Sequence, residues 1–570
     1  MTLSRRTRNI LIGIVIFLGL LAIAFQVFID RWLEPVIRQR LNTLIVSGSD
    51  SLYSFQLGKI DVNFWEGSVE LNGLHVQVDS LHYAEREKAG TLPALTFDIG
   101  LDKGLVSNVR LLQIVLKKKI SVGTILSKSA SIGLSRHYRK SKQKQKPKTA
   151  EKPLWQLLEP DIRALQVDQI LLNDINLNYS NADSAKAFHF KFDHCSATID
   201  DTRIDSSSSA DTSRILFTRD ISILFNNINL QTPDAMYKIE AKQLRYSSQK
   251  QLLAADEFRL HPVLSQPAFY RKVGYDKDRF AVDIEKMQLI NFQLPQWINR
   301  NIISTDTLSL THPQIHVYKD RTAPSDTRSK YGKYPHQLLN NAPFNIQVRR
   351  VNIKDGLVTY TEKNQKSGME GKLIFQQLEG HISNVTNDDD RIGNNPKCVA
   401  DFHGLFMKQS PIHAVFTFYL NKAESGAFEA SADLEKVDAQ EITPVTLALA
   451  QASVKSFDIS ELHYHITGNE RVGTGNLTML YKNLEIELKK VDEDNGKIKK
   501  KGLLSFLVNK LVVYPNNPSD GKERKAVNIK TDRIRNKSFF NLVWKTLYAA
   551  VKDITIRIDS LKKDKSQKKK

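Results

Sequence analysis

Few residues in this 570-residue chain have the types and spacing that catalysis or metal binding requires. His463 and His465 are separated by one residue, so on a strand both imidazoles lie on one face and could hold a metal. No third ligand follows at a diagnostic spacing, and we interpret them as surface or cross-strand packing residues. Asp388, Asp389 and Asp390 lack the alternating ligands and terminal Glu of an EF-hand. We interpret this run as a solvated turn.

The motifs of the common enzyme classes do not occur in the sequence. There is no Walker A loop, no dinucleotide-binding glycine fingerprint, no HExxH and no GxSxG. Glu66 and Glu70 flank a predicted hairpin turn, but nothing around them indicates the burial that general acid–base catalysis favours. The sequence therefore predicts no catalytic residue, no metal site and no cofactor, and indicates that the protein is not an enzyme. An enzyme that acts on a polymer of the cell envelope is a further hypothesis, ranked after the two non-enzymatic functions given at the end of this section.

The two cysteines, Cys195 and Cys398, exclude a disulfide scaffold and supply no zinc cluster. They could pair in an oxidising compartment. Two distant thiols in a chain that uses so little cysteine are more typical of separate core residues.

The net charge of +20 is concentrated in two short segments. Residues 139–148 carry six Lys or Arg, and residues 562–570 carry six Lys against one Asp. Both segments are polar and are interpreted as a solvated loop and a solvated tail, with anionic lipid head groups or another acidic surface polymer as the alternative contact. Nucleic acid is not expected as a partner, because the N-terminal anchor predicted from residues 10–29 would place both segments across the membrane from the cytoplasm.

One uncharged run, Ile10–Ile29, is long enough at 1.5 Å per residue to cross a hydrocarbon core of about 30 Å. Arg5, Arg6 and Arg8 precede it, so residues 1–9 are expected to stay in the cytoplasm while the body crosses. A cleaved signal peptide is the alternative, because residues 22–24 resemble a cleavage site. The apolar run continues beyond that site, and we therefore expect a retained single-pass anchor.

Beyond the anchor, apolar and polar residues mostly alternate, which predicts antiparallel strands with one apolar and one polar face. Such a sheet either closes on a packed core or curls and leaves an apolar trough. Periodicity alone favours the closed core, whereas a trough could hold acyl chains at about 0.8 kcal/mol per buried methylene. The candidate lining residues of a trough are Phe55, Leu57, Val62, Phe64, Val167, Ile170, Leu172, Val348, Val351, Ile353, Phe416 and Phe418.

An internal repeat organises the middle of the chain. Residues 165–179 align without a gap to residues 346–360, at a constant offset of 181. The identical pairs are Gln166 and Gln347, Val167 and Val348, Asp174 and Asp355, and Tyr179 and Tyr360. The alignment indicates a duplicated strand–linker–helix–hairpin unit.

Two helices are expected late in the chain. One spans Val445–Ala452, directly after Pro444. The other is amphipathic, with an apolar stripe that comprises Phe540, Val543, Trp544, Leu547, Val551 and Ile554. This helix either caps an open end of the β structure or lies on a membrane or partner, where Trp544 and Tyr548 would suit the interface.

The chain resembles the AsmA-like family of Gram-negative bacteria, which includes TamB-type proteins. The residues that carry the resemblance are the anchor followed by residues 32–42, the strand 55–62, the two repeat segments and residues 426–488. The resemblance implies an inner-membrane-anchored, periplasmic β-sheet curled into an apolar groove. It also implies a role in outer-membrane biogenesis, in several relatives as a bridge for phospholipids. The chain is short for such a bridge, and its basic linkers interrupt the strand rhythm, which argues against end-to-end transport by one copy.

Together these observations predict a mainly β fold: an N-terminal transmembrane helix, an elongated, curled antiparallel sheet with a few short helices, and a C-terminal amphipathic helix. The expected organisation is a cytoplasmic N-terminus (1–9), transmembrane helix (10–29), first β region (30–138), basic linker (139–152), β repeat 1 (153–318), linker (319–333), β repeat 2 (334–400), C-terminal β region (401–490), variable segment (491–535), amphipathic helix (536–560) and Lys-rich tail (561–570).

The expected location is the inner membrane, with most of the chain in the periplasm. The expected function is binding of phospholipid or another acyl lipid in support of lipid transport or outer-membrane biogenesis. The alternative is a non-enzymatic scaffold that recruits outer-membrane assembly proteins through a closed β body and its terminal helix.

Overall fold

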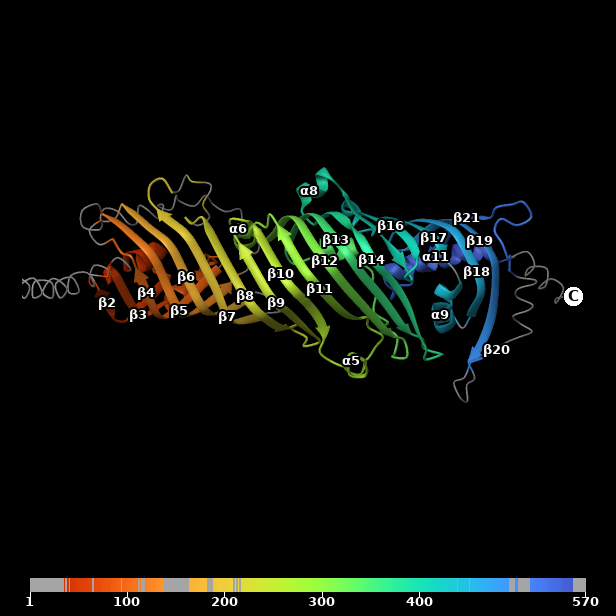
Figure 1. Ribbon diagram of the computed structural model, residues 1–570, viewed down its shortest axis with the longest axis horizontal. Helices are drawn as coiled ribbons and strands as arrows, with labels where there is room; N and C mark the ends of the chain where they lie inside the picture. Colours follow the sequence, from red (N-terminus) through yellow and green to blue (C-terminus); the bar gives the residue numbers. More distant parts are fainter. Residues whose placement is uncertain are drawn as a thin grey trace, which may run out of the picture. The chain divides into compact units, whose positions relative to one another are not determined.

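The computed structural model describes most of the body of the chain (Figure 1). The described ranges are 42–63, 66–93, 95–110, 118–137, 163–181, 188–208, 217–437, 439–450, 452–491, 498–500 and 513–556, with the isolated residues 35, 38, 39, 113, 211 and 214. The predicted anchor 10–29, the basic linker 139–152 and the tail 561–570 lie outside these ranges. Within them, no helix has both the length and the apolar composition needed to span a membrane.

The protein is mainly β with few helices, as predicted. It divides into two compact units: unit 1 comprises residues 1–228 and 243–252, and unit 2 comprises residues 229–242 and 253–570. The division falls inside the predicted first β repeat. Each unit is built on a mixed β-sheet that does not close on itself.

Unit 1 begins with two short helical turns, η1 (Asn42–Val46) and η2 (Ser47–Ser49), and contains helix α2 (Ser80–Ala89). Its strands are β1 (Tyr53–Leu57), β2 (Ile60–Asn63), β3 (Ser68–Val78), β4 (Leu95–Ser107), β5 (Lys119–Arg136), β6 (Ala164–Asn181), β7 (Phe188–Ile204) and most of β8 (Asp220–Gln231). Strands β1 and β2 both pair with β3, and the pairing then follows chain order to β8.

Unit 2 contains most of the helices. Its strands are part of β9 (Tyr237–Ser247), β10 (Leu252–Pro262), β11 (Arg279–Ile290), β12 (Ile302–Asp320), β13 (Asn345–Lys363), β14 (Glu370–Thr386), β15 (Lys397–Phe406), β16 (Ser410–Tyr419), β17 (Phe428–Val437), β18 (Ala452–Gly468), β19 (Val472–Val491), β20 (Ile498–Lys500) and β21 (Lys525–Asp532). Its helices are α5 (Gln266–Val273), α6 (Leu294–Arg300), α7 (Pro335–Asn340), α8 (Asp389–Asn394), η3 (Leu420–Lys422), α9 (Ala439–Ala450) and α11 (Phe539–Thr555).

The sheet predicted as antiparallel is mixed, because the described residues of each unit include a parallel strand pair. Strand β5 pairs in parallel with β6, and β12 pairs in parallel with β13. The segments between the paired strands, 137–163 and 321–344, are long enough for the crossover that a parallel pair requires. Alternating burial has a period of two in both kinds of sheet, so the sequence pattern did not distinguish them.

The two parallel pairs coincide with the internal repeat. Strands β6 and β13 begin 181 residues apart, and each pairs in parallel with the strand before it and antiparallel with the strand after it. Asp174 and Asp355 both have left-handed backbone conformations, with φ of 54° and 52°. In each strand the register with the next strand shifts on both sides of the residue that follows, Ile175 or Gly356. The two segments therefore carry the same β-bulge at the same position.

Three local predictions need correction. Helix α9 begins at Ala439, so Pro444 lies inside it and not before it. Asp388 is the N-cap of α8, where its carboxylate accepts a hydrogen bond from the Arg391 N–H, so the run of Asp residues is more ordered than a solvated turn. The predicted linker 319–333 begins two residues too early, because β12 continues to Asp320 and Lys319 is buried in an ion pair with Asp278.

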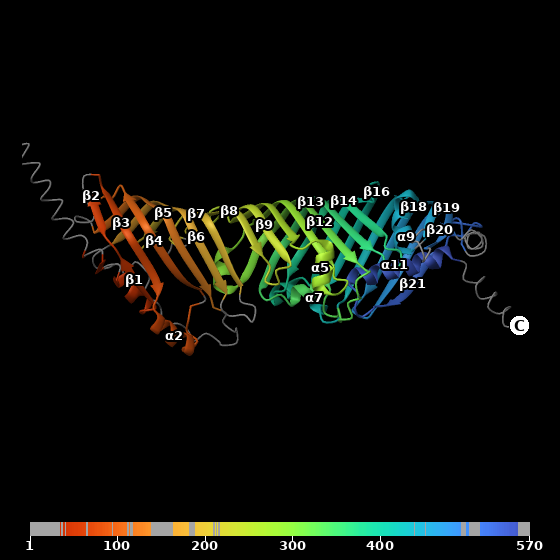
Figure 2. The same ribbon diagram turned by 90° about the horizontal axis from the view of Figure 1, so that it is seen from below.

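The largest apolar core lies in unit 2 under helices α9 and α11. Its strand residues come from β15–β19, and α11 contributes Phe539, Leu542, Ala550 and Ile554. Figure 2 shows α11 running beside β21. The remaining clusters of fully buried apolar residues contain only three or four members each. Burial is therefore concentrated at one end of unit 2.

One histidine is enclosed in this core. His336 of α7 is 2% exposed, and its ring lies 5.2 Å from the ring of Phe418 and 6.3 Å from that of Tyr334. Neither ring nitrogen has a hydrogen-bond partner. Burial disfavours the charged imidazolium and lowers the pKa of His336 to about 4.

Acidification is expected to destabilise unit 2 through His336. Between pH 6.5 and about 4 the unfolded chain binds a proton that the folded chain excludes. The free energy of unfolding therefore decreases as the pH is lowered through this window. The free energy of unfolding should fall by about 2 kcal/mol between pH 7 and pH 5, measured by urea unfolding. His336→Phe should remove this contribution. An unchanged pH slope in that variant would show that His336 titrates normally.

Candidate functional site

The strand registers of unit 2 align apolar side chains into rows that cross the sheet. One row is Leu289, Leu308, Val351 and Ile382, and it continues to Ala400 and Phe416. A second row is Val282, Ile315, Val358 and Phe375. Ile382 and Phe416 pack against the core under α11. Both rows therefore lie on the face of the sheet that α11 covers at its C-terminal strands.

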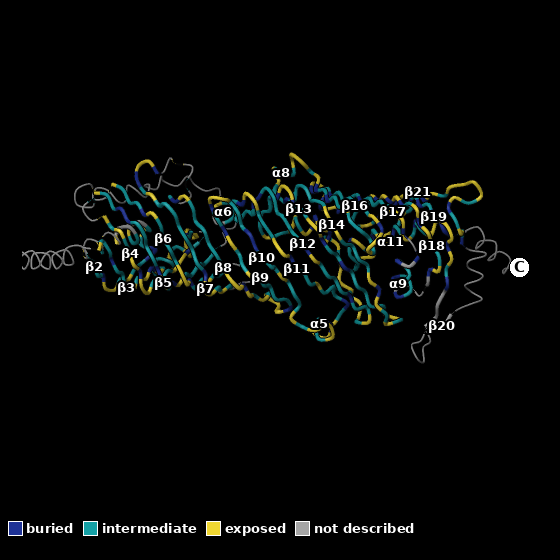
Figure 3. Tube along the Cα trace, viewed as in Figure 1, coloured by how far each residue is buried: buried dark blue, intermediate teal, exposed yellow. Residues whose placement is uncertain are grey.

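The rows over β11–β14 are not fully covered. The side chains of Val282, Ile315, Val358 and Phe375 are all partly exposed, and the strands in Figure 3 are mostly of intermediate burial. Phe280, on the same face as Val282 at the start of β11, is 40% exposed. By contrast, Ile466, Leu477 and Met479 under α11 are almost completely buried. Unit 2 therefore has one closed and one open stretch of the same apolar face.

Unit 1 has rows of the same kind. One is Phe55, Val76, Ile99, Ile132 and Leu177, and the next is Leu57, Leu74, Leu101, Ala130 and Ile175. Phe97 of β4, on the same face as Ile99, is 36% exposed. Apolar side chains that remain in contact with solvent are thus a property of both units.

The predicted lining residues fall mainly on these rows. Phe55 and Leu57 begin the two rows of unit 1, and Val62 pairs with Val69 in a neighbouring row that reaches Ile170. Leu172 lies beside Ser127, and Val167 is buried beside Val122. Phe64 lies outside the described residues.

In unit 2, Ile353 is partly exposed on the open stretch, whereas Val351 is buried beside Ile382 and Val348 is buried beside Val385. Phe416 and Phe418 are placed differently, because their rings lie 6.2 and 5.5 Å from the ring of Phe539 in α11. They belong to the closed core.

Sequence reasoning missed the partly exposed apolar residues of β11 and β12, such as Val282 and Ile315. In β11 the apolar positions Phe280, Val282 and Ile284 are followed by Met287 and Leu289, so the alternation changes phase at Glu285 and Lys286. A search that allowed one phase change per strand would have found this row. The lining residues predicted for this part of the chain came from the repeat segment in β13.

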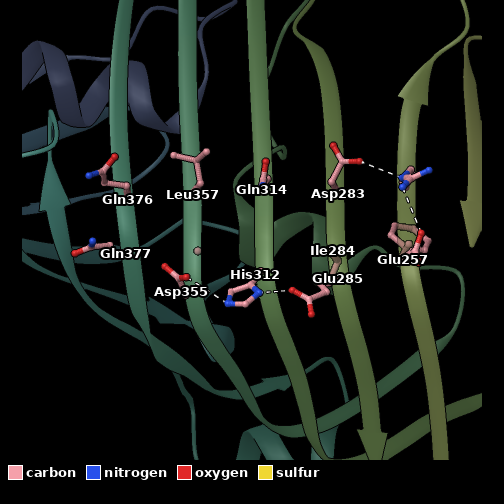
Figure 4. Close-up of a pocket in the computed structure, with 13 residues that line it drawn as sticks. Glu257, Asp283, Ile284, Glu285, His312, Gln314, Asp355, Leu357, Gln376 and Gln377 are labelled. Atoms are coloured by element: carbon pink, nitrogen blue, oxygen red, sulfur yellow. Dashed lines mark hydrogen bonds and ion pairs between the residues drawn. The ribbon is translucent and has the colours of Figure 1, made fainter.

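The opposite face is polar, and the bulges create a shallow, charged pocket on it (Figure 4). His312, itself in a left-handed conformation, lies between Glu285 and Asp355: its Nδ1 contacts the Glu285 carboxylate and its Nε2 lies 3.3 Å from Asp355 Oδ2. The hydrogen bond to Glu285 raises the pKa of His312. All three side chains are well exposed, so the arrangement neutralises charge at the bulge and lacks the enclosed geometry of an acid–base catalyst.

Other histidines on the polar face also pair with carboxylates. His463 and His465 are both exposed on one side of β18, as predicted, and His463 contacts Asp433 and Glu461. On β15 and β16, Asp401, His403 and His413 each place one potential metal ligand within 4.8 Å of the other two. The two cysteines are free and buried, one in each unit, and burial raises the thiol pKa of both.

Helix α11 lies within the predicted range, but the predicted apolar stripe is not its buried face. The fully buried residues are Phe539, Leu542, Thr546, Ala550 and Ile554, of which only Ile554 was in that stripe. Val543, Leu547 and Val551 pack at the edge of the core. Phe540, Trp544 and Tyr548 form a separate exposed row, at 64%, 55% and 51% exposure. The helix therefore covers the sheet with one face and presents an aromatic row with another.

Substitutions in α11 should separate these two faces. Leu542→Ala removes a side chain from the closed core and should lower the free energy of unfolding by about 2–5 kcal/mol. Trp544→Ala on the exposed row should change it by about 0.5 kcal/mol or less. Urea unfolding followed by circular dichroism measures both. Equal losses would show that the aromatic row is part of the fold.

Comparison by sequence matches the chain to no protein-family model and to no curated protein. The resemblance to the AsmA-like family thus rests on the anchor, the repeat segments and the C-terminal strands alone. The function is inferred below from the geometry of the apolar face.

Proposed function

We propose that this chain is an inner-membrane-anchored periplasmic protein that binds lipid acyl chains on the apolar face of its sheet and supports lipid transport or outer-membrane biogenesis. The observation that carries the proposal is the partial exposure of the aligned row Val282, Ile315, Val358 and Phe375. A closed β fold would bury such a row completely, as the core under α11 does.

The chemistry of the open stretch suits an acyl chain. Its rows present aliphatic and aromatic carbon across four strands, spaced at roughly 4.8 Å. Each methylene that leaves water gains up to about 0.8 kcal/mol, so a fatty-acyl segment that follows the row would bind through its length and not through one polar contact. Such binding requires no nucleophile, metal or cofactor.

The polar character of the opposite face supports lipid binding on the apolar face alone. Gln288, Ser309 and Asn352 form a row on β11–β13, and Asp283 and Gln314 form another. Because these rows and the apolar rows occupy opposite faces, lipid and solvent would meet different sides of one sheet. The predicted anchor 10–29 would hold the body at the inner membrane, and the basic segments would contact anionic head groups.

A second function is favoured by the exposed row Phe540, Trp544 and Tyr548. Its i, i+4, i+8 spacing aligns three aromatic side chains along α11, as in helices that dock on a membrane interface or a partner. Under this alternative the chain is a scaffold that recruits outer-membrane assembly proteins through α11.

Photo-crosslinking in cells tests the lipid proposal with matched neighbours. A photoreactive residue is placed at Ile315, Ile353 or Leu177 on the apolar face, and at Gln314, Asn352 or Asn178 next to each on the polar face. Mass spectrometry should find lipid adducts at the first three positions and not at the other three.

The outcome also separates the two functions. Absence of lipid at Ile315, Ile353 and Leu177, or equal labelling on both faces, would contradict lipid binding by the sheet. Protein adducts from a probe at Trp544, combined with that absence, would support the scaffold.

A further inference from the structure

Two histidines and an aspartate meet on the polar face of unit 2. Asp401 and His403 are two residues apart on β15, so both side chains lie on one face. His413 of β16 is directly opposite His403 in the register. The two imidazole rings are stacked, with centroids 4.0 Å apart and an angle of 7° between the planes.

One potential ligand atom from each residue lies close to the other two. Asp401 Oδ1 lies 2.9 Å from His413 Nε2 and 3.8 Å from His403 Nε2, and all three ligand atoms are within 4.8 Å of one another. Zinc–nitrogen bonds of about 2.0–2.1 Å place tetrahedral ligands roughly 3.3 Å apart. Because parallel rings cannot direct both in-plane lone pairs at one ion, one imidazole would rotate out of the stack when the metal binds.

We propose that Asp401, His403 and His413 form a binding site for a divalent transition-metal ion, with Zn²⁺ the best match. Two imidazoles and one carboxylate are the ligand types that zinc takes in sites with three protein ligands. Magnesium and calcium prefer all-oxygen ligands and fit this set poorly.

A further carboxylate lies near His413. His413 turns Nε2 toward Asp401, to which it is hydrogen-bonded at 2.9 Å, and Nδ1 toward Asp433, whose Oδ2 is 3.8 Å away. Asp433 is itself held by His463 Nδ1 at 2.7 Å. A metal would replace the hydrogen bond between His413 and Asp401, and Asp433 would then be placed to orient the ring through Nδ1.

The adjacent strand could complete the coordination. On β14, His381 is opposite Asp401 and Glu379 is opposite His403 in the register. Directly opposed side chains on one face have Cβ atoms about 4.5–5.5 Å apart, so either residue is near enough to supply a fourth ligand. The site would then connect β14, β15 and β16.

The ordinary alternative is a set of surface ion pairs between aspartates and protonated histidines. The zinc titration described next distinguishes the two, because ion pairs alone would give no saturable metal binding. The proposal concerns the polar face and does not depend on lipid binding.

Zinc titration of the full chain tests the site. The protein carries no polyhistidine tag, is treated with chelator and is titrated with Zn²⁺ in a calorimeter. One site is expected whose affinity falls at least 100-fold in His403→Asn combined with His413→Asn, and also in Asp401→Asn. Asp433→Asn should weaken it by about 10–100-fold.

The matched control is His261→Asn combined with His312→Asn, which removes two other histidines that pair with carboxylates. It should leave the zinc site unchanged. Co²⁺ in place of Zn²⁺ should give visible absorption bands typical of low-coordinate cobalt in the wild type only, which a merely structural role of the histidines would not produce. No saturable binding by the wild type, or binding unchanged in the double variant whose circular dichroism is native, would overturn the proposal.

Discussion

The covering of the apolar face is the constraint on which the rest of the structure depends. A sheet whose strands alternate apolar and polar side chains must keep its apolar face out of water. In unit 2 two helices do this at one end, where α11 and α9 close the core around Ile466, Leu477 and Met479. Over β11–β14 the same face continues, and the row of Val282, Ile315, Val358 and Phe375 is partly exposed. In our proposal, acyl chains cover that row.

Register keeps the two faces distinct over strands as long as 20 residues. A slip of one position would exchange every apolar and polar side chain, so a long strand needs devices that absorb local irregularity. The bulges at Asp174 and Asp355 are such devices, and they occur at equivalent points of the repeat. At the second bulge His312 neutralises two carboxylates, Glu285 and Asp355, on the outer surface. The change of phase at the bulge thus leaves apolar rows on one face and charge on the other.

Much of the fold could be predicted from the sequence, because alternation and the 181-residue repeat are local patterns. The mainly β fold, the long strand that contains residues 346–360 and the terminal helix followed from them. The parallel pairs did not, since β5 and β12 show the same alternation in either orientation. The site at Asp401, His403 and His413 was missed because nine residues separate the two histidines and only pairing of β15 with β16 brings them together. The buried face of α11 was misjudged because Phe540 and Trp544 are apolar yet exposed.

The most direct test of the central claim is the amount of phospholipid that stays bound when the full chain is extracted gently and purified. Lipid mass spectrometry is applied to the wild type, to Ile315→Asp combined with Val358→Asp on the apolar face, and to Gln314→Asp combined with Asn352→Asp on the polar face. Bound phospholipid in the wild type and the polar-face variant, with at least a tenfold loss in a folded apolar-face variant, is the predicted result. Equal lipid in all three, or none in the wild type, would contradict the claim that the open face holds acyl chains.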